Sequence, residues 1–266
     1  MYSKIIAIVG VPRSGTSWLG QIIDSSPAVR YRYQPIFSYA FKDAVDEDSS
    51  KKEYQQFFEG IYTSDDDFLC QKERKEKGIY PTFEEKKEEP DNLAFKMVRY
   101  HHLVPDMLNY FDNLKGVGII RHPCAVINSW LSTPKEFPDD ADPKEEWRHG
   151  ECRNKGHPEE YWGFEAWKEV TEMYMDLEEE YPDQFTIVKY ENLVDNPFEE
   201  TQELFDFLDL SYTDQTENFL RKSQERHDDD PYSVFRDKKV KEKWKWELDE
   251  EIKEEILSEL NEFDIY

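Results

Sequence analysis

The chain has 266 residues and a formal net charge of -26, from 60 acidic and 34 basic residues. This balance argues against binding to the phosphate backbone of nucleic acid, which requires a basic surface. The length permits one large core, and no internal repeat divides it, so we expect a single domain over residues 1–266. No apolar run reaches the length of a membrane span, which favours a cytoplasmic protein whose oligomeric state stays open. The three cysteines have no metal-site spacing and are expected to be free thiols.

The first element is an apolar, β-branched run that leads into a glycine-rich turn. The sequence KIIAIVGVPRSGTSWL predicts a buried strand, a tight turn and the start of a helix. Its glycines have the spacing of G-x-x-x-x-G-K-[ST], in which backbone amides surround phosphate oxygens at a helix N-terminus. Thr16 replaces the lysine of that pattern, and the positive charge lies three residues earlier, at Arg13. An ordinary Gly-Ser turn explains the coincidence less well than a phosphate site formed by Pro12, Arg13, Ser14, Gly15, Thr16, Ser17 and Trp18.

The next segments predict helices that alternate with strands. Residues 27–35 are expected to be irregular or extended, and an aromatic helix is expected from Phe37. The charged segment 46–90 carries apolar residues at helical spacing, which predicts a helical insertion over the sheet. A second buried strand is predicted over 93–98, followed by an amphipathic helix over 103–114.

A second phosphate contact is predicted at the end of a third strand, residues 116–120. Arg121 follows this strand directly, and Pro123 favours a helix that begins two residues later. Ser129 then lies about two helical turns further along, so both side chains can reach one ligand group. A structural ion pair of Arg121 is the alternative that the spacing leaves open.

Residues 133–163, rich in Pro, Asp and Glu, are predicted to form a long loop or lid. The pattern then predicts a helix over 165–180, a strand over 185–190, and helices over 196–208 and 249–260. Strands alternating with helices indicate the α/β class, with a mainly parallel sheet covered on both faces. Ligands of such sheets bind at the carboxyl ends of the strands, where both predicted phosphate contacts lie.

These segments resemble those of sulfotransferases that use 3'-phosphoadenosine 5'-phosphosulfate (PAPS). VPRSGTSWL, from Val11, resembles their 5'-phosphosulfate loop, and RHPxxVxxS, from Arg121, resembles their 3'-phosphate motif. VKYENLVDNP, from Val188, is similar to the family's segment after the lid. The resemblance implies a three-layer α/β sandwich with a P-loop-like loop. It also implies metal-independent, in-line sulfuryl transfer to a hydroxyl or amine, with adenosine 3',5'-bisphosphate as the product.

The resemblance implies a role for each matching residue. Gly15, Thr16 and Ser17 would bind the 5'-phosphosulfate together with Arg13, and Arg121 and Ser129 would bind the 3'-phosphate. Arg13 stands where many relatives have a catalytic lysine. Its role should be electrostatic, since a guanidinium donates no proton at neutral pH.

The chain departs from the family at the general base. Val98 stands two residues after the strand-end Lys96, where cytosolic relatives have a histidine, and Gln34 stands where others have a glutamate. The remaining candidates are His101 and His102, whose usual pKa suits the task, with His102 preferred. Packing or surface roles stay open for both.

Two further predictions concern the C-terminal region and the tryptophans. Arg236 and Lys239 are predicted phosphate contacts, because relatives often close this region over the nucleotide with basic residues. A solvated basic turn is the alternative. Trp18, Trp130, Trp162 and Trp167 could stack on an adenine or a sugar, although tryptophans at helical spacing also suit a core.

The acceptor and two rival functions remain open from sequence. The acceptor is expected to be a hydroxyl of a small molecule, a carbohydrate or a lipid, and the acidity mildly disfavours a polyanion. A nucleotide-dependent small-molecule kinase is one rival, disfavoured because Thr16 leaves no loop lysine for the β and γ phosphates. A catalytically silent adenine-nucleotide-binding protein is the other, suggested by the missing base.

Overall fold

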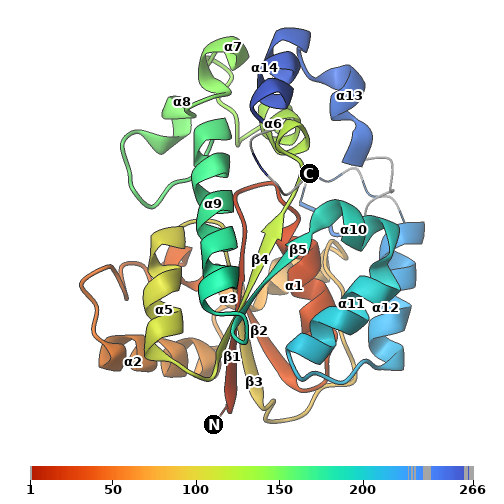
Figure 1. Ribbon diagram of the computed structural model, residues 1–266. Helices are drawn as coiled ribbons and strands as arrows, with labels where there is room; N and C mark the ends of the chain where they lie inside the picture. Colours follow the sequence, from red (N-terminus) through yellow and green to blue (C-terminus); the bar gives the residue numbers. More distant parts are fainter. Residues whose placement is uncertain are drawn as a thin grey trace.

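The computed structural model describes residues 2–226, 228, 230, 232–235, 241–260 and 263. Arg236 and Lys239 lie outside the described residues. The described residues form a central five-stranded sheet with the order β2-β3-β1-β4-β5, in which every neighbouring pair is parallel (Figure 1). In chain order the strands are Lys4–Val9 (β1), Val29–Tyr33 (β2), Asn92–Met97 (β3), Leu114–Ile120 (β4) and Phe185–Lys189 (β5).

Helices cover both faces of this sheet, which gives the three layers expected from the sequence (Figure 1). Among the described residues, none of these helices has the length and apolarity that crossing a membrane requires. The helices are α1 (Thr16–Asp24), α2 (Lys51–Thr63), α3 (Asp67–Cys70), α4 (Lys72–Glu76), α5 (Val104–Tyr110), α6 (Pro123–Leu131), α7 (Pro143–Glu146), α8 (Glu151–Asn154), α9 (Phe164–Glu180), α10 (Tyr190–Asp195), α11 (Pro197–Phe207), α12 (Asp214–Glu225), α13 (Trp244–Glu247) and α14 (Glu250–Leu260).

The side chains of β1 alternate between two hydrophobic cores because successive residues of a strand point to opposite faces. Ile5, Ala7 and Val9 pack in one core with the apolar faces of α2, α5, α6, α9 and α14. Ile6 and Ile8 pack in the other core with α1, α10, α11 and α12. Burial on both sides explains why this strand reads as a continuous apolar run.

The segment that follows α1 agrees with one sequence prediction and contradicts another. Residues 29–33 form a regular edge strand, although their VRYRY pattern lacks a continuous apolar run. Arg32 is buried there because its guanidinium donates to the carbonyl oxygens of Ile61, Tyr62 and Ser64 at the end of α2. The aromatic helix predicted from Phe37 is wrong: a 3-10 turn, Pro35–Phe37, ends at the extended residue Ser38.

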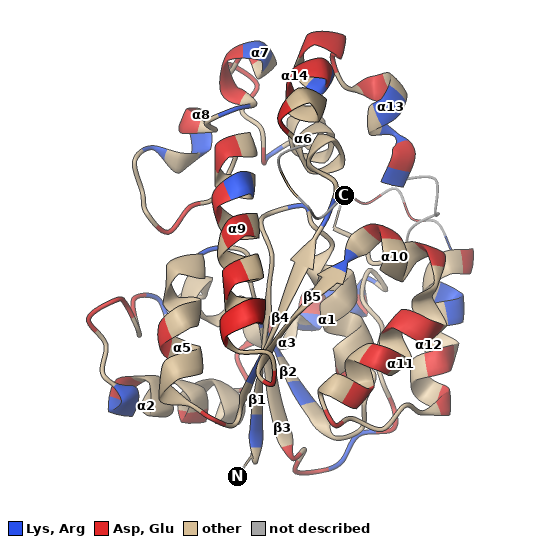
Figure 2. Ribbon diagram, in the orientation of Figure 1, with Lys and Arg blue, Asp and Glu red and all other residues tan. Residues whose placement is uncertain are grey.

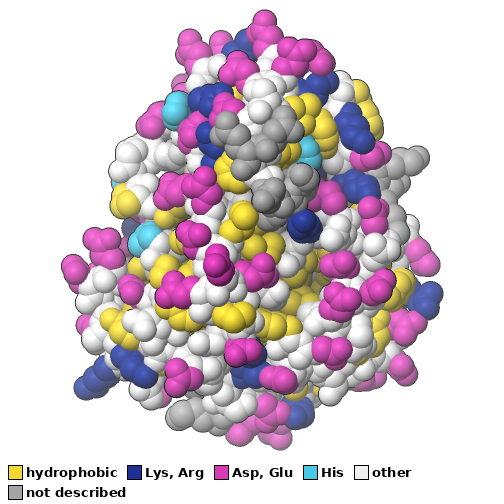
Figure 3. Space-filling view, in the orientation of Figure 1, with side chains coloured by type: hydrophobic (Ala, Val, Ile, Leu, Met, Phe, Trp, Pro, Cys, Tyr) yellow, Lys and Arg dark blue, Asp and Glu magenta, His cyan; other side chains and the backbone are white. Residues whose placement is uncertain are grey.

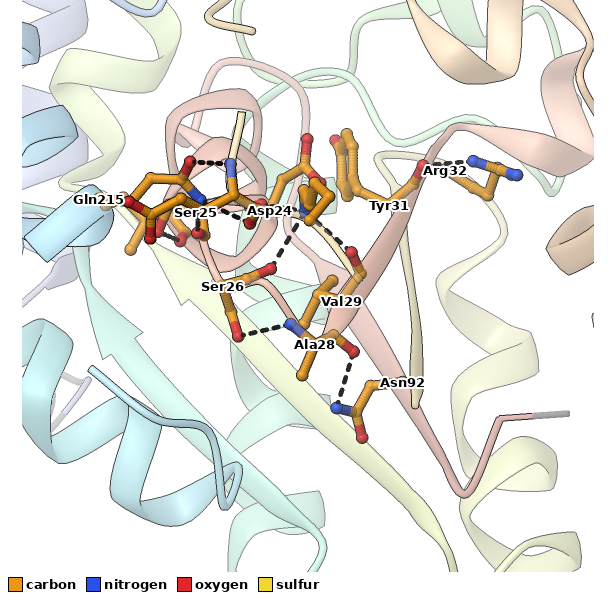
Figure 4. Close-up of polar contacts among 12 residues, drawn as sticks. Asp24, Ser25, Ser26, Ala28, Val29, Tyr31, Arg32, Asn92 and Gln215 are labelled. Atoms are coloured by element: carbon orange, nitrogen blue, oxygen red, sulfur yellow. Dashed lines mark hydrogen bonds and ion pairs between the residues drawn. The ribbon is translucent and has the colours of Figure 1, made fainter. Parts of the chain in front are cut away.

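A buried ionic network ties the end of α1 to the start of β2 (Figure 4). Lys86 Nζ donates to Asp24 Oδ1 at 2.7 Å and to the carbonyl oxygens of Ser26 and Val29 at 3.1 and 2.8 Å. The Asp24 side chain is only 5% exposed, so its charge depends on this ammonium group and on Lys75 Nζ, which lies 3.9 Å from Oδ2. Gln215 of α12 joins the network through the Ser25 carbonyl oxygen.

Lys86→Met is expected to lower the free energy of unfolding by about 2–3 kcal/mol, because it removes the nearer cation of the buried Asp24 carboxylate and leaves only Lys75 Nζ, 3.9 Å from Oδ2. The matched control is Lys87→Met, because Lys87 pairs with Asp91 where both side chains are more than half exposed. This control should cost well under about 1 kcal/mol. Urea denaturation of the two variants measures the difference, and equal losses would contradict the structural role of the network.

Candidate active site

A cavity of about 540 Å³ lies at the carboxyl ends of β1, β3 and β4. The loop between β1 and α1 lines it with Pro12, Arg13, Gly15, Thr16, Ser17 and Trp18. Arg121, which follows β4, and Ser129 on α6 line the same cavity. Of the described residues that the sequence predicted as phosphate contacts, Ser14 alone is missing from the lining, because its side chain is fully buried behind the loop.

The turn before α1 leaves the N-terminus of this helix open toward the cavity. Gly15 has φ +95°, a left-handed conformation that side chains disfavour, and no side chain caps the first turn that begins at Thr16. A Cβ atom on Gly15 would lie 2.5 Å from the Tyr190 ring. Glycine is therefore required at this position for two reasons: a Cβ atom would clash with Tyr190, and the backbone is left-handed. The uncapped N–H groups and the helix dipole can bind an anion.

Direct contacts join the two predicted motifs. Arg13 Nε donates to Ser129 Oγ at 3.0 Å, and Arg121 Nη1 donates to the Arg13 carbonyl oxygen at 2.9 Å. The Arg121 guanidinium is buried and lies 4.7 Å from the centre of the Tyr190 ring. Residues more than a hundred positions apart in the chain thus form one polar group around the loop.

Lys96 is a cavity residue to which the sequence assigned no binding role. It is the fifth residue of β3, is 2% exposed, and donates from Nζ to Ser17 Oγ at 2.8 Å. Its ammonium group lies 4.4 Å from the centre of the Tyr33 ring, and burial lowers the pKa of Lys96. A lysine inside the apolar strand NLAFKM was the available signal, because a buried cation requires polar partners.

An aromatic and basic wall that includes Phe37, Phe68 and Arg99 forms part of the cavity lining. The Phe37 ring lies 6.1 Å from the Phe68 ring, and the Arg99 guanidinium lies 4.2 Å from the centre of the Phe37 ring. Glu160 pairs with Arg99 at 2.8 Å and accepts a hydrogen bond from the Trp162 indole. Phe68 comes from the segment 46–90, predicted to be a helical insertion over the sheet, and Trp162 from the segment 133–163, predicted to be a loop or lid.

The tryptophans divide between the cavity and the core. The Trp18 indole donates to Ser223 Oγ at 3.1 Å and packs edge-on against Tyr190, so its ring lies on the cavity wall nearest α12. Trp162 and Trp244 also line the cavity. Trp130 and Trp167 are core residues, each 1% exposed.

The two histidines predicted as candidate bases lie outside the cavity lining. His101 is fully buried, with Nδ1 2.9 Å from the Tyr174 hydroxyl, and burial lowers its pKa to about 3. His102 Nδ1 lies 3.2 Å from the Tyr161 hydroxyl. The His101 ring packs against Tyr174 of α9, a contact that the sequence could not predict.

The cavity is basic although the protein is strongly acidic. Acidic residues gather on the outward faces of α9, α11, α12 and α14, and they are spread over the surface in Figure 3 (Figures 2 and 3). Among the described residues, the acids in the cavity lining are Glu136 and Glu247. The cations in the lining are Arg13, Arg74, Lys96, Arg99, Arg121, Lys135, Arg153 and Lys243. This local charge favours an anionic ligand against the overall field.

The parallel sheet, the glycine turn and the open N-terminus of α1 define an α/β protein with a P-loop-like fold. The chain belongs to the sulfotransferase family, whose model matches residues 6–214. The resemblance predicted from the motifs is therefore confirmed. None of the curated protein sequences compared with this chain matches it.

Solved structures share the fold at low sequence identity. A retinol dehydratase in complex with androsterone and inactive cofactor PAP is 14% identical, with a TM-score of 0.58 over 100% of this chain and 83% of that one. A mouse sulfotransferase complexed with PAP is 14% identical, with a TM-score of 0.55 over 100% and 87%. The sulfotransferase domain of the Synechococcus PCC 7002 olefin synthase is 15% identical, with a TM-score of 0.54 over 100% and 96%.

Proposed function

We propose that this sulfotransferase uses PAPS as its donor and transfers the sulfuryl group to a hydroxyl or amine of a small-molecule acceptor. The observation that carries the proposal is the contact between the two phosphate motifs, through Arg13 with Ser129 and through Arg121 with the Arg13 carbonyl oxygen. PAPS carries phosphate on both the 3' and the 5' oxygen of its ribose, so its binding site requires two phosphate-binding motifs close together. The PAP that two of the structures sharing the fold contain supports the same donor.

The residues present fit such a donor. The uncapped N-terminus of α1 and the hydroxyls of Thr16 and Ser17 suit the 5'-phosphosulfate. Arg121 and Ser129 suit the 3'-phosphate, while Trp18 offers a ring face to the adenine. PAPS supplies an activated sulfuryl group, which must leave a phosphate behind. Arg13 and Lys96 are placed to stabilise the charge that develops on this phosphate.

We place the acceptor against the aromatic and basic wall around Phe37, Phe68 and Trp162. These rings suit a partly apolar molecule, and Arg99 holds one of them by a cation–π contact. Sulfuryl transfer should therefore be measured with a panel of acceptors that contains phenols and alkyl alcohols as well as sugars and amines. Turnover of sugars alone would contradict this placement.

Arg121→Ala is expected to weaken the binding of adenosine 3',5'-bisphosphate by about 10- to 100-fold, the effect of losing a buried, charge-assisted contact. Isothermal titration calorimetry measures the dissociation constant. The matched control is Arg221→Ala, because Arg221 is exposed and pairs with Glu217 on α12. This control should bind like the unmutated protein.

The same measurements separate the rival functions. No binding of the bisphosphate to the unmutated protein would overturn the proposal, and tighter binding of ATP with magnesium would point to a kinase. Normal binding without release of bisphosphate from PAPS, with any acceptor of the panel, would point to a silent nucleotide-binding protein. Release that depends on an acceptor supports the transferase.

A further inference from the structure

We propose that Glu136 is the general base that takes the proton from the acceptor. This inference rests on the proposed function, and it assigns the role for which the sequence offered His101 and His102. Glu136 lies in the segment 133–163 and lines the cavity, whereas neither histidine does.

A tight turn built on the core fixes the position of Glu136. Its backbone N–H donates to the Thr133 carbonyl oxygen, and its own carbonyl oxygen accepts a hydrogen bond from the buried Trp130 indole at 3.2 Å. The next residue, Phe137, packs edge-on against Trp130 with ring centres 5.3 Å apart. Lys135, just before Glu136, has φ +74°. The turn therefore holds the Glu136 side chain rigidly in the cavity.

The carboxylate lies beside the cation that is placed to act on the sulfuryl donor. Its Oε1 is 3.6 Å from Arg13 Nη1, and the side chain is 17% exposed. Its Oε2 is buried and, among the described residues, accepts no hydrogen bond of normal geometry. The Tyr232 phenol also interacts with this carboxylate. Because a buried carboxylate oxygen gains from each further donor, an incoming hydroxyl that donates to Oε2 would be bound favourably.

The charged and titratable groups around Glu136 come from three other elements. Arg13 faces it from the loop after β1, Lys96 from β3, and Tyr232 from the segment 232–235. Burial, and then the negative charge of Glu136, raises the pKa of the Tyr232 phenol, and a hydrogen bond between the phenol and the Glu136 carboxylate adds to this rise. Glu247, the other acid of the lining, accepts a hydrogen bond from Asn128 at 3.0 Å and is therefore already engaged.

The step balances with these groups alone. A lone pair of the acceptor oxygen forms a bond to sulfur, while the bond between sulfur and the bridging phosphate oxygen breaks. The electron pair of the broken bond stays on that phosphate oxygen, beside Arg13 and Lys96. The proton of the acceptor hydroxyl moves to Oε2 of Glu136, which releases it to water after the product leaves.

The test is Glu136→Gln, which keeps the shape of the side chain and removes the base. We expect kcat to fall by about 100-fold or more with KM little changed. We also expect the loss to shrink along a series of phenols of decreasing pKa, because an already ionised acceptor needs no base. The rate of PAPS hydrolysis, in which water is the acceptor, is measured for the unmutated protein and for Glu136→Gln. Calorimetry with adenosine 3',5'-bisphosphate should show binding that is unchanged or tighter, since a negative charge beside Arg13 is removed.

The control is Asp140→Asn, an equivalent loss of charge at an exposed position of the same segment, which should leave kcat and binding unchanged. An equal loss of kcat for every acceptor, or no loss, would overturn the role of Glu136 as base. Loss of bisphosphate binding in Glu136→Gln would indicate a structural role and would overturn it too. Failure of the unmutated protein to bind the bisphosphate would instead contradict the proposed function.

Discussion

Arg13→Ala is expected to lower kcat by about 100- to 1000-fold, the usual effect of removing a group that stabilises charge in the transition state. Arg13 lies in the loop between β1 and α1, and its guanidinium contacts Ser129 Oγ at 3.0 Å and the Glu136 carboxylate at 3.6 Å. The affinity for adenosine 3',5'-bisphosphate should fall less, by about 10-fold or less, because the helix N-terminus and Arg121 remain. Steady-state kinetics and calorimetry on the same preparation separate the two effects.

Arg13→Lys is the matched control, because it keeps the charge but loses the fork of donors that holds Ser129 and Glu136 together. It should recover part of the lost kcat. A variant that loses bisphosphate affinity and kcat by the same factor would show that Arg13 acts in ground-state binding instead.

Gly15→Ala is expected to lower the free energy of unfolding by about 2–5 kcal/mol and to reduce bisphosphate binding strongly. The left-handed backbone at φ +95° costs about 1–2 kcal/mol for a residue with a Cβ atom. The contact of that atom with the Tyr190 ring, at 2.5 Å, adds about 1–3 kcal/mol of overpacking. Relief of this clash must move the loop or α10, and either movement displaces the N–H groups that the ligand requires.

Gly78→Ala is the control that separates the clash with Tyr190 from the cost of placing a Cβ atom on a left-handed backbone. Gly78 also has a positive φ, +68°, but no heavy atom lies within 4 Å of the position of an added Cβ atom. This control should lose about 1–2 kcal/mol and bind the bisphosphate normally. Denaturation curves for the two variants, with calorimetry for each, make the comparison. Equal losses of stability and full binding in both would show that Tyr190 does not limit the loop.

The sequence predicted the strands β1, β3, β4 and β5 from their apolar residues. It left residues 27–35 open between irregular and extended, because the charges of β2 are satisfied by tertiary contacts such as those of Arg32 with the end of α2. The same distinction applies to the site. The loop from Pro12 to Ser17 is a local pattern whose spacing carries its chemistry. Arg121 and Ser129 form another, because the end of a strand and the start of a helix are both visible in sequence.

The pairing of these groups was decided only by the tertiary structure. No spacing links Arg13 to Ser129 or to Glu136, and the contacts exist because β1 and β4 are neighbours in the sheet and the turn of Glu136 follows α6. Lys96 reaches Ser17 for the same reason, since β3 lies next to β1. The sequence by itself determined the sulfotransferase family, the α/β fold and the two motifs, because these depend on local periodicity and spacing. The fold decided which side chains meet at the cavity, because strand order and packing against α6 and α9 set distances that a linear pattern does not contain.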